Sequence, residues 1–208
     1  MPNNKKNNTI GVFDSGLGGL TVLKHFLKKL PQYDYLYLGD TARVPYGGHS
    51  QEVIYRYTKE AVDFLFAEGC RLVILACNTA SSQALRRLQQ EYLPAKYPDR
   101  RILGVILPLA EYAAKSKKIG VIGTRATISS GAYEHEIKKI NKEAQIISNS
   151  APLLVPLIEE GFAGKDVSNK ILKKYLHPLK NKKVETLILG CTHYPFLLKD
   201  ARRILGKN

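Results

Sequence analysis

The sequence predicts an α/β protein built from two small lobes, each with a mostly parallel sheet flanked by helices. Short apolar runs of strand length alternate with longer stretches of helix length along the 208 residues. This alternation is typical of βαβ units, which form a parallel sheet covered by helices. A polar, proline-containing stretch at 93–101 interrupts the alternation and predicts a hinge. We therefore expect a first lobe at 1–98 and a second at 99–208, with the active site between the lobes.

The predicted elements follow from the apolar runs and from the helix start and stop signals. The helix at 51–68 is the best marked, because Ser50 suits an N-cap and Gly69 follows its end. The expected strands are 9–13, 35–38, 72–76, 102–107, 119–123, 145–148 and 187–190. The expected helices are 21–30, 51–68, 81–91, 109–115, 130–140, 153–160, 167–176 and 196–205, the last returning towards the first lobe.

Composition excludes several classes of protein. The chain is 44% hydrophobic and 24% charged, which suits a globular protein with a real core. It contains no apolar run of the roughly 20 residues that a membrane helix needs. Residues 1–8 are polar and lack the apolar segment of a secretory signal. We expect a cytoplasmic protein with a frayed N-terminal tail and no membrane partner.

The three cysteines are Cys70, Cys77 and Cys191, and an odd number favours free thiols over a disulfide framework. None has zinc-finger spacing. Cys77, Cys191 and His193 could supply three metal ligands, but we expect no metal.

The net charge of +14 comes largely from lysines within 115–118, 138–142 and 170–183. The preferred interpretation is a solvated face; the alternative is attraction of anionic small molecules, or weak adhesion to nucleic acid or acidic partners. We expect no nucleic-acid partner, because no basic motif interleaved with aromatic residues is present.

The glycine loop at 16–19 invites a nucleotide-binding interpretation. Its glycines are out of register with G-x-G-x-x-G, and Asp14 at its mouth would repel a phosphate. A tight strand-to-helix turn is the simpler interpretation of these glycines. The loop could also bring backbone N–H groups close to a small ligand.

Two strand ends resemble each other. "LVILACNTA" (72–80) and "TLILGCTHY" (186–194) both run from an apolar strand through a small residue to a cysteine and then to hydrogen-bonding residues. Ligands of open α/β sheets lie beyond such carboxyl ends, so the thiols of Cys77 and Cys191 could flank one ligand. A lone strand-end cysteine is usually only a small buried residue, and Cys70 is interpreted in that way.

Two opposed thiols suit a particular chemistry. Disulfide oxidoreductases normally use C-x-x-C, and a Cys-His hydrolase or a one-base isomerase needs only one thiol. Two-base racemisation needs two, because a thiolate removes the α-proton from one face and a thiol protonates the other. A free thiol has a pKa of about 8.5 and needs help to act as a base. Asp14 could assist Cys77, and His193 could assist Cys191. Donors for a substrate carboxylate are Ser15, Asn78, Thr79 and Thr192.

The motifs "IGVFDSGLGGLTVLK", "YLGDTARVPYGGHS", "LACNTASS", "IGTRAT", "VPLIEEG" and "LGCTHYPFL" occur in this order from residue 10 to 197. Together they resemble bacterial glutamate racemases of the aspartate/glutamate racemase superfamily. The resemblance implies cofactor-independent interconversion of L- and D-glutamate, which supplies D-glutamate for peptidoglycan and so serves cell-wall biogenesis and cell shape.

The resemblance also implies roles for individual residues. Cys77 would deprotonate D-glutamate and Cys191 would deprotonate L-glutamate, with Asp14, His193 and Glu159 as supporting acid/base residues. Glu160 is adjacent to Glu159, and the helix register could favour either. The substrate contacts implied are Asp14, Ser15, Pro45, Tyr46, Gly47, Asn78, Thr79, Thr124, Thr127, Thr192 and His193.

One departure from the family is expected to matter. Its members usually continue for several tens of residues beyond this C-terminus, and that tail completes the first lobe. Two alternatives stay open beside glutamate racemisation, one because of this tail and one because the sequence does not give the depth of the substrate pocket. One is a catalytically impaired, truncated homologue that acts as an interaction protein, for example by binding DNA gyrase; the other is an aspartate-specific racemase. The sequence also leaves the oligomeric state open, with a homodimer as one option.

Overall fold

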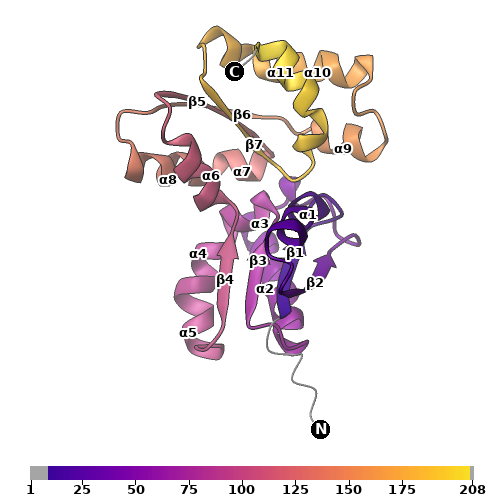
Figure 1. The fold of residues 1–208 in the computed structure, drawn as a ribbon, viewed down its shortest axis with the longest axis vertical. Coiled ribbons are helices and arrows are strands. Elements are labelled where there is room, and N and C mark those ends of the chain that lie inside the picture. Colours follow the sequence, from indigo (N-terminus) through magenta and orange to yellow (C-terminus); the bar gives the residue numbers. More distant parts are fainter. Residues whose placement is uncertain (1–8, 207–208) are drawn as a thin grey trace. The chain divides into compact units, whose positions relative to one another are not determined.

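The computed structural model describes residues 9–206, and the expectation of a frayed tail at residues 1–8 lies outside the described part. The chain divides into two compact units, Met1–Val105 and Ile106–Asn208 (Figure 1). Each unit has its own parallel sheet flanked by helices. The predicted fold class of two α/β lobes is therefore confirmed.

The first unit contains a four-stranded sheet in the order β2-β1-β3-β4, and every neighbouring pair is parallel. Its strands are β1 (Thr9–Asp14), β2 (Asp34–Gly39), β3 (Leu72–Leu75) and β4 (Arg101–Gly104). Its helices are α1 (Leu20–Lys29), η2 (Tyr46–Gly48), α2 (Gln51–Ala67), α3 (Asn78–Gln83), α4 (Leu85–Arg87), η3 (Leu88–Tyr92) and α5 (Leu93–Lys96). The start of α2 is confirmed: Ser50 accepts a hydrogen bond from the Val53 N–H at 3.5 Å. Gly69 follows its C-cap with a φ of +93°, a conformation that favours glycine.

The second unit contains a three-stranded parallel sheet in the order β6-β5-β7. Its strands are β5 (Lys118–Gly123), β6 (Gln145–Ser150) and β7 (Thr186–Gly190). Its helices are α6 (Ile106–Ala113), α7 (Arg125–Ser129), α8 (Ala132–Ile140), α9 (Leu154–Glu159), α10 (Asp166–Asn181), η4 (Tyr194–Leu197) and α11 (Leu198–Leu205). Helix α11 packs against α10 of its own unit.

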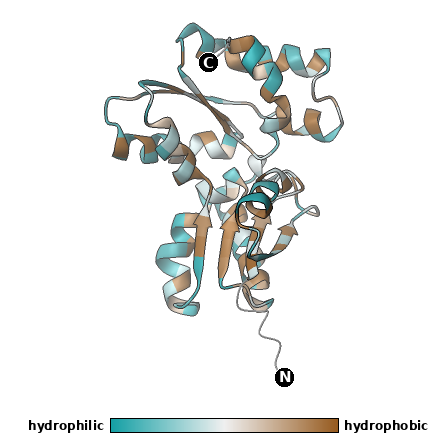
Figure 2. Cartoon of the chain, viewed as in Figure 1, coloured by the Kyte–Doolittle hydropathy of each residue, from teal (hydrophilic) through white to brown (hydrophobic). Residues whose placement is uncertain are grey.

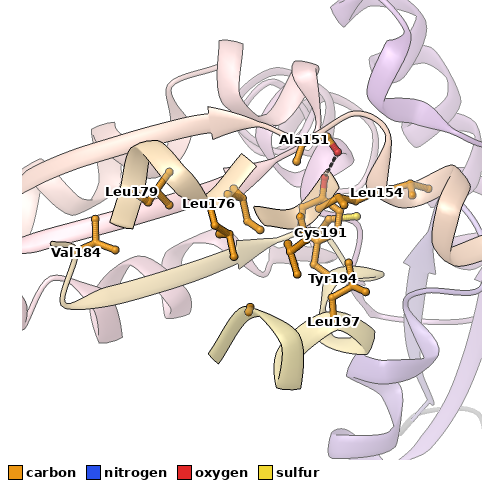
Figure 3. Packing of buried hydrophobic residues seen from close by; sticks show 12 residues of the cluster. Ala151, Leu154, Leu176, Leu179, Val184, Cys191, Tyr194 and Leu197 are labelled. Carbon is orange, nitrogen blue, oxygen red and sulfur yellow. Dashed lines mark hydrogen bonds between the residues drawn. The ribbon is translucent and has the colours of Figure 1, made fainter. Parts of the chain in front are cut away.

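The core of the second unit lies on both faces of its sheet, because successive strand residues point to opposite faces. Val121 of β5 packs with residues of α6 and α8, whereas the next residue, Ile122, packs with residues of α10. Figure 3 labels Leu176 and Leu179 of α10 in this second cluster. Helix α10 contributes Leu172, Leu176 and Leu179, each at most 1% exposed. Each such leucine stabilises the fold by about 1.5–3 kcal/mol through burial. Figure 2 shows the strands as the most hydrophobic segments of the first unit.

The boundary between the units differs from the predicted one. Strand β4 is shorter than the predicted strand at 102–107, because Ile106 already begins α6. β4 pairs with β3, so the sheets have four and three strands instead of three and four. The stretch at 93–101, predicted as a hinge, begins with α5, which continues the helical run of η3 without a break. The division falls between Val105 and Ile106.

Three helix predictions also need correction. The predicted helix at 81–91 starts earlier, at Asn78, because Cys77 acts as its N-cap, and it is divided into α3, α4 and η3. A short helix, α7, precedes α8, where a single helix at 130–140 was predicted. α10 runs on to Asn181 and includes Pro178, although we predicted its end at 176. Within residues 9–206, no helix is both long and apolar enough to cross a membrane.

Candidate active site

The first unit places a thiol where β3 meets α3. Parallel strands end at the same edge of a sheet, and the pairing of Phe13 with Leu75 puts the ends of β1 and β3 side by side. Cys77 is only 4% exposed, and its Sγ accepts a hydrogen bond from the Ala80 N–H at 3.4 Å. Cys77 Sγ also lies 3.5 Å from Ser15 Oγ. This edge therefore brings together Cys77 and Ser15, two residues that the sequence predicted for the site.

The glycine loop after β1 holds a buried carboxylate. Asp14 is fully buried, and its Oδ2 accepts a hydrogen bond from the Gly16 N–H at 3.0 Å. The Tyr37 hydroxyl donates to the Gly16 carbonyl at 2.7 Å. A Cβ atom at Gly19 would lie 2.5 Å from Asp14 Cβ, so this position has no room for a side chain. The loop is thus a close-packed turn around Asp14.

This environment sets the protonation of Cys77. Burial, as the larger cause, and the negative charge of Asp14 together raise the pKa of the Cys77 thiol to about 11. Hydrogen bonds from Ser15 and Ala80 act in the opposite direction but do not outweigh burial. Cys77 is therefore a neutral thiol at rest at neutral pH, and in this protonated form it can donate a proton.

A hydrogen-bonded network fixes the loop that contains η2. The Tyr46 hydroxyl donates to Asp40 Oδ2 at 2.5 Å, and Arg43 Nε donates to the same oxygen at 2.7 Å. Arg43 also forms an ion pair with Glu60. Tyr46 is 1% exposed, and its ring centroid lies 6.1 Å from that of Phe13. This network positions the Pro45–Tyr46–Gly47 backbone beside the sheet edge.

Asp40 and Arg43 were missing from the predicted site residues. A signal for Asp40 was present in the sequence, since "LGDTA" puts it just after an apolar strand, much as "VFDSG" puts Asp14 at the end of one. Arg43 carried no such signal, because its role depends on the fold of the loop.

The second unit places its thiol after β7. Gly123 pairs with Gly190, so Thr124 after β5 and Cys191 after β7 lie at the same edge. Thr124 is the N-cap of α7; its Oγ1 accepts from the Thr127 N–H at 3.1 Å and lies 3.0 Å from Thr127 Oγ1. These two hydroxyls and that of Thr192 are buried.

An imidazole connects Cys191 to a carboxylate. His193 Nδ1 lies 3.8 Å from Cys191 Sγ, and His193 Nε2 lies 3.0 Å from Glu159 Oε1. The His193 side chain is 7% exposed and that of Glu159 is 38% exposed. A carboxylate at Nε2 can hold a proton on that nitrogen and leave Nδ1 free to accept one from the thiol. Between the two neighbouring glutamates, the contact to His193 is made by Glu159, the last residue of α9.

The backbone before Cys191 is tightly packed. A Cβ atom at Gly190 would lie 2.8 Å from the Ile122 carbonyl oxygen and 3.2 Å from the Tyr133 ring. The Tyr194 hydroxyl donates to the Ala151 carbonyl at 2.9 Å, which anchors the loop after Cys191 (Figure 3). Burial raises the pKa of Tyr133 and of Tyr194, and the nearby Cys191 adds to both shifts. Both phenols therefore stay neutral around the thiol.

The predicted site residues divide between the two units. The first unit holds Asp14, Ser15, Pro45, Tyr46, Gly47, Cys77, Asn78 and Thr79. The second unit holds Thr124, Thr127, Glu159, Cys191, Thr192 and His193. Across the described part of the chain, no three His, Cys, Asp or Glu residues are grouped so that they could hold a metal ion. The donor set is one of thiols, hydroxyls, an imidazole and carboxylates.

The fold and these strand ends define a class: α/β proteins of two parallel-sheet units, each with a thiol and proton-transfer groups at a strand end. The family model described as Asp/Glu/Hydantoin racemase matches residues 18–208. The chain belongs to this family.

Its relatives include glutamate racemases at high identity. The chain is 48% identical over 202 residues to the glutamate racemase of Geobacter metallireducens, and the aligned part covers 95% of the chain and 71% of that relative. It is also 48% identical over 199 residues to the glutamate racemase of Aquifex aeolicus, covering 94% of the chain and 75% of that relative.

Solved structures show the same likeness. The glutamate racemase of Francisella tularensis in complex with D-glutamate matches with a TM-score of 0.89 at 38% identity, over 96% of the chain and 74% of that structure. The glutamate racemase isoform RacE1 of Bacillus anthracis matches with a TM-score of 0.90 at 37% identity, over 97% of the chain and 75% of that structure. An aspartate racemase of Picrophilus torridus, at 16% identity and a TM-score of 0.63, shares the fold alone.

Proposed function

We propose that this chain is a glutamate racemase that interconverts L- and D-glutamate by a two-base mechanism without a cofactor. The observation that carries the proposal is the pair of strand-end thiols, Cys77 after β3 and Cys191 after β7, each with its own proton-transfer groups. The high identity to glutamate racemases over most of the chain supports glutamate as the substrate.

In this mechanism the two thiols have opposite roles in each turnover. For L-glutamate, the Cys191 thiolate takes the α-proton, and the electron pair of the broken C–H bond moves into the α-carboxylate. The Cys77 thiol then gives its proton to the opposite face, and a new C–H bond forms there. One thiol gains a proton and the other loses one, so the reaction is balanced. D-glutamate reacts in the reverse sense.

The environments of the thiols support this assignment. Burial and Asp14 raise the pKa of Cys77 to about 11, which keeps it protonated and ready to donate. His193, held by Glu159, provides Cys191 with an acceptor for its thiol proton. The resting enzyme is then poised to turn over L-glutamate.

The remaining predicted residues are proposed to bind the substrate. An α-proton becomes removable only when hydrogen-bond donors stabilise the charge that develops on the carboxylate. The hydroxyl, amide and backbone groups proposed for this task belong to Ser15, Pro45, Tyr46, Gly47, Asn78, Thr79, Thr124, Thr127 and Thr192. The D-glutamate formed would supply peptidoglycan synthesis in the cytoplasm.

Racemisation in D₂O tests the proposal directly. Purified chain, with no added cofactor, should convert either enantiomer of glutamate to the racemate, as followed by circular dichroism. Mass spectrometry should find deuterium at the α-carbon of the product. The same assay with L-aspartate should give much slower turnover, and faster turnover of aspartate would favour the aspartate-specific alternative.

A folded but inactive protein would overturn the proposal. The check is a far-ultraviolet circular-dichroism spectrum together with a cooperative unfolding transition. Binding to DNA gyrase by such an inactive, folded chain would favour the interaction-protein alternative.

A further inference from the structure

Outside the thiol sites, the second unit carries a groove along α10 and α11. The two helices pack against each other (Figure 1). The groove has a volume of about 610 Å³. Its lining residues are Asp166, Asn169, Lys170, Lys173, His177, Lys180, Asn181, Arg203 and Ile204. None of them belongs to the predicted racemase site.

The lining comes mainly from one face of α10. Lys170, Lys173, His177 and Lys180 recur every three or four residues, which places them on one side of a helix. The opposite side carries the buried leucines of the core, so the two kinds of residue alternate along α10 in Figure 2. At 1.5 Å per residue, the row from Lys170 to Lys180 is about 15 Å long.

The groove is electropositive. Three lysines and one arginine line it against a single aspartate, Asp166. Arg203 is paired with Asp200 at 2.8 Å, whereas Lys170, Lys173 and Lys180 form no ion pair with any residue in 9–206. Like charges three or four residues apart on a helix destabilise it. A bound anion would relieve this repulsion.

The lining also indicates the size and type of the anion. The volume falls in the range of about 300–1,000 Å³ that is usual for small-molecule sites. Lysine ammonium groups bind phosphates as point charges, and Asn169 and Asn181 can hydrogen-bond to their oxygens. The lining includes no Phe, Tyr or Trp; His177 contributes its one ring, and Ile204 is its one aliphatic residue.

We propose that the α10–α11 groove is a binding site for a short phosphate chain, held by Lys170, Lys173 and Lys180. The phosphate chain could be an inorganic oligophosphate or the oligophosphate part of a nucleotide. Because the lysines outnumber the groups that could contact a base, the phosphates provide most of the affinity in both cases. The site is separate from the thiols, so the binding does not depend on racemase activity.

Calorimetric titration of the full chain with tripolyphosphate tests the proposal. The groove variant is Lys170→Gln/Lys173→Gln/Lys180→Gln, whose three positions are all exposed. The matched control, Lys24→Gln/Lys28→Gln/Lys29→Gln, removes the same charge from exposed positions of α1 in the first unit. Circular dichroism verifies that both variants are folded.

We expect tripolyphosphate to bind the parent chain and the control alike, and to bind the groove variant at least about tenfold more weakly. Affinity should fall on the order of tenfold between low and physiological salt, because each lysine–phosphate contact is screened. Saturating tripolyphosphate should raise the melting temperature of the parent chain but not that of the groove variant.

Four results would overturn the proposal. If the control variant lost as much affinity for tripolyphosphate as the groove variant, the net charge alone would attract the anion. If tripolyphosphate did not bind the parent chain, the lysines would form only a solvated helix face. Adenosine triphosphate binding much more tightly than tripolyphosphate would show that a base is recognised. The last result concerns a single-stranded oligonucleotide. If its binding requires the three lysines and the binding of tripolyphosphate does not, the groove would be a nucleic-acid site instead.

Discussion

The two thiol sites look alike in sequence but differ in their surroundings. Cys77 is hydrogen-bonded to a hydroxyl and a backbone N–H, near a buried carboxylate, whereas Cys191 lies 3.8 Å from an imidazole that contacts Glu159. The first environment favours the neutral thiol, and the second offers an acceptor for its proton. Similar strand ends can therefore be given opposite resting roles by their neighbours.

The largest expected effect comes from removing either thiol. Cys77→Ala and Cys191→Ala should each lower racemisation by about 10³-fold or more, because an acid/base group usually contributes 10²–10⁴-fold and nothing replaces it. The remaining thiol should still exchange one α-proton with D₂O. Cys77→Ala should exchange that of L-glutamate, and Cys191→Ala that of D-glutamate, as followed by proton NMR.

The matched control is Cys70→Ala, since Cys70 is also a buried free cysteine but belongs to the core. Its turnover should stay close to that of the parent. Exchange of the same enantiomer in both active-site variants would contradict the opposite handedness of the two thiols.

A second comparison concerns the residue before each cysteine. Ala76 precedes Cys77, whereas Gly190 precedes Cys191, where a Cβ atom would lie 2.8 Å from the Ile122 carbonyl. Gly190→Ala should destabilise the protein by about 1–3 kcal/mol through overpacking, and should displace Cys191 as well. Urea unfolding and turnover measure the two effects.

The reciprocal change, Ala76→Gly, should cost only about 0.5–1 kcal/mol through backbone entropy. Gly48→Ala serves as the control, because open space surrounds that position. If Gly190→Ala were as stable and active as Gly48→Ala, the close packing before Cys191 would not be needed.

Removing the charge of Glu159, the residue that contacts His193, should have a smaller effect on turnover. Glu159→Gln removes the charge that orients the imidazole. Turnover should fall by roughly tenfold, because a partly exposed carboxylate contact contributes about 1 kcal/mol or less and the imidazole also loses its orientation. Glu160→Gln, one residue further along, should leave turnover close to that of the parent. Steady-state rates with both enantiomers measure this, and equal losses in the two variants would argue against a specific role for Glu159.

Much of the fold was predictable because its signals are local. Apolar runs gave all seven strands, and Ser50 and Gly69 marked α2. The position of the unit boundary was not predictable from local signals. The short run "RILG" forms β4 and belongs to the first sheet because it pairs with β3. That pairing is a long-range contact, which local sequence signals do not reveal.

The same distinction applies to the candidate site. The thiols were visible in sequence because two strand ends repeat a pattern. The choice between Glu159 and Glu160 depends on where α9 ends, and the sequence left it open. The Asp40–Arg43–Tyr46 network was missed, because its partners meet only once the loop around η2 has folded.

The smallest expected effect concerns the two causes of the raised pKa of Cys77, which are burial and the charge of Asp14. Burial is the largest cause of its raised pKa, and the negative charge of Asp14 is the second. In a Cys70→Ala/Cys191→Ala background, Asp14→Asn should lower the pKa of Cys77 from about 11, because the charge that disfavours the thiolate is gone. More thiolate is then present at each pH below this pKa. Iodoacetamide should therefore alkylate Cys77 faster in the variant at every pH between about 8 and 10, as measured by intact mass.

Asp34→Asn, at the exposed start of β2, is the matched loss of a carboxylate and should leave the alkylation rate unchanged. Equal rates with and without Asp14 would mean that its charge does not act on the thiol. The resting state of Cys77 would then be set by burial alone, and the difference between the two thiol sites would depend on His193 rather than on Asp14.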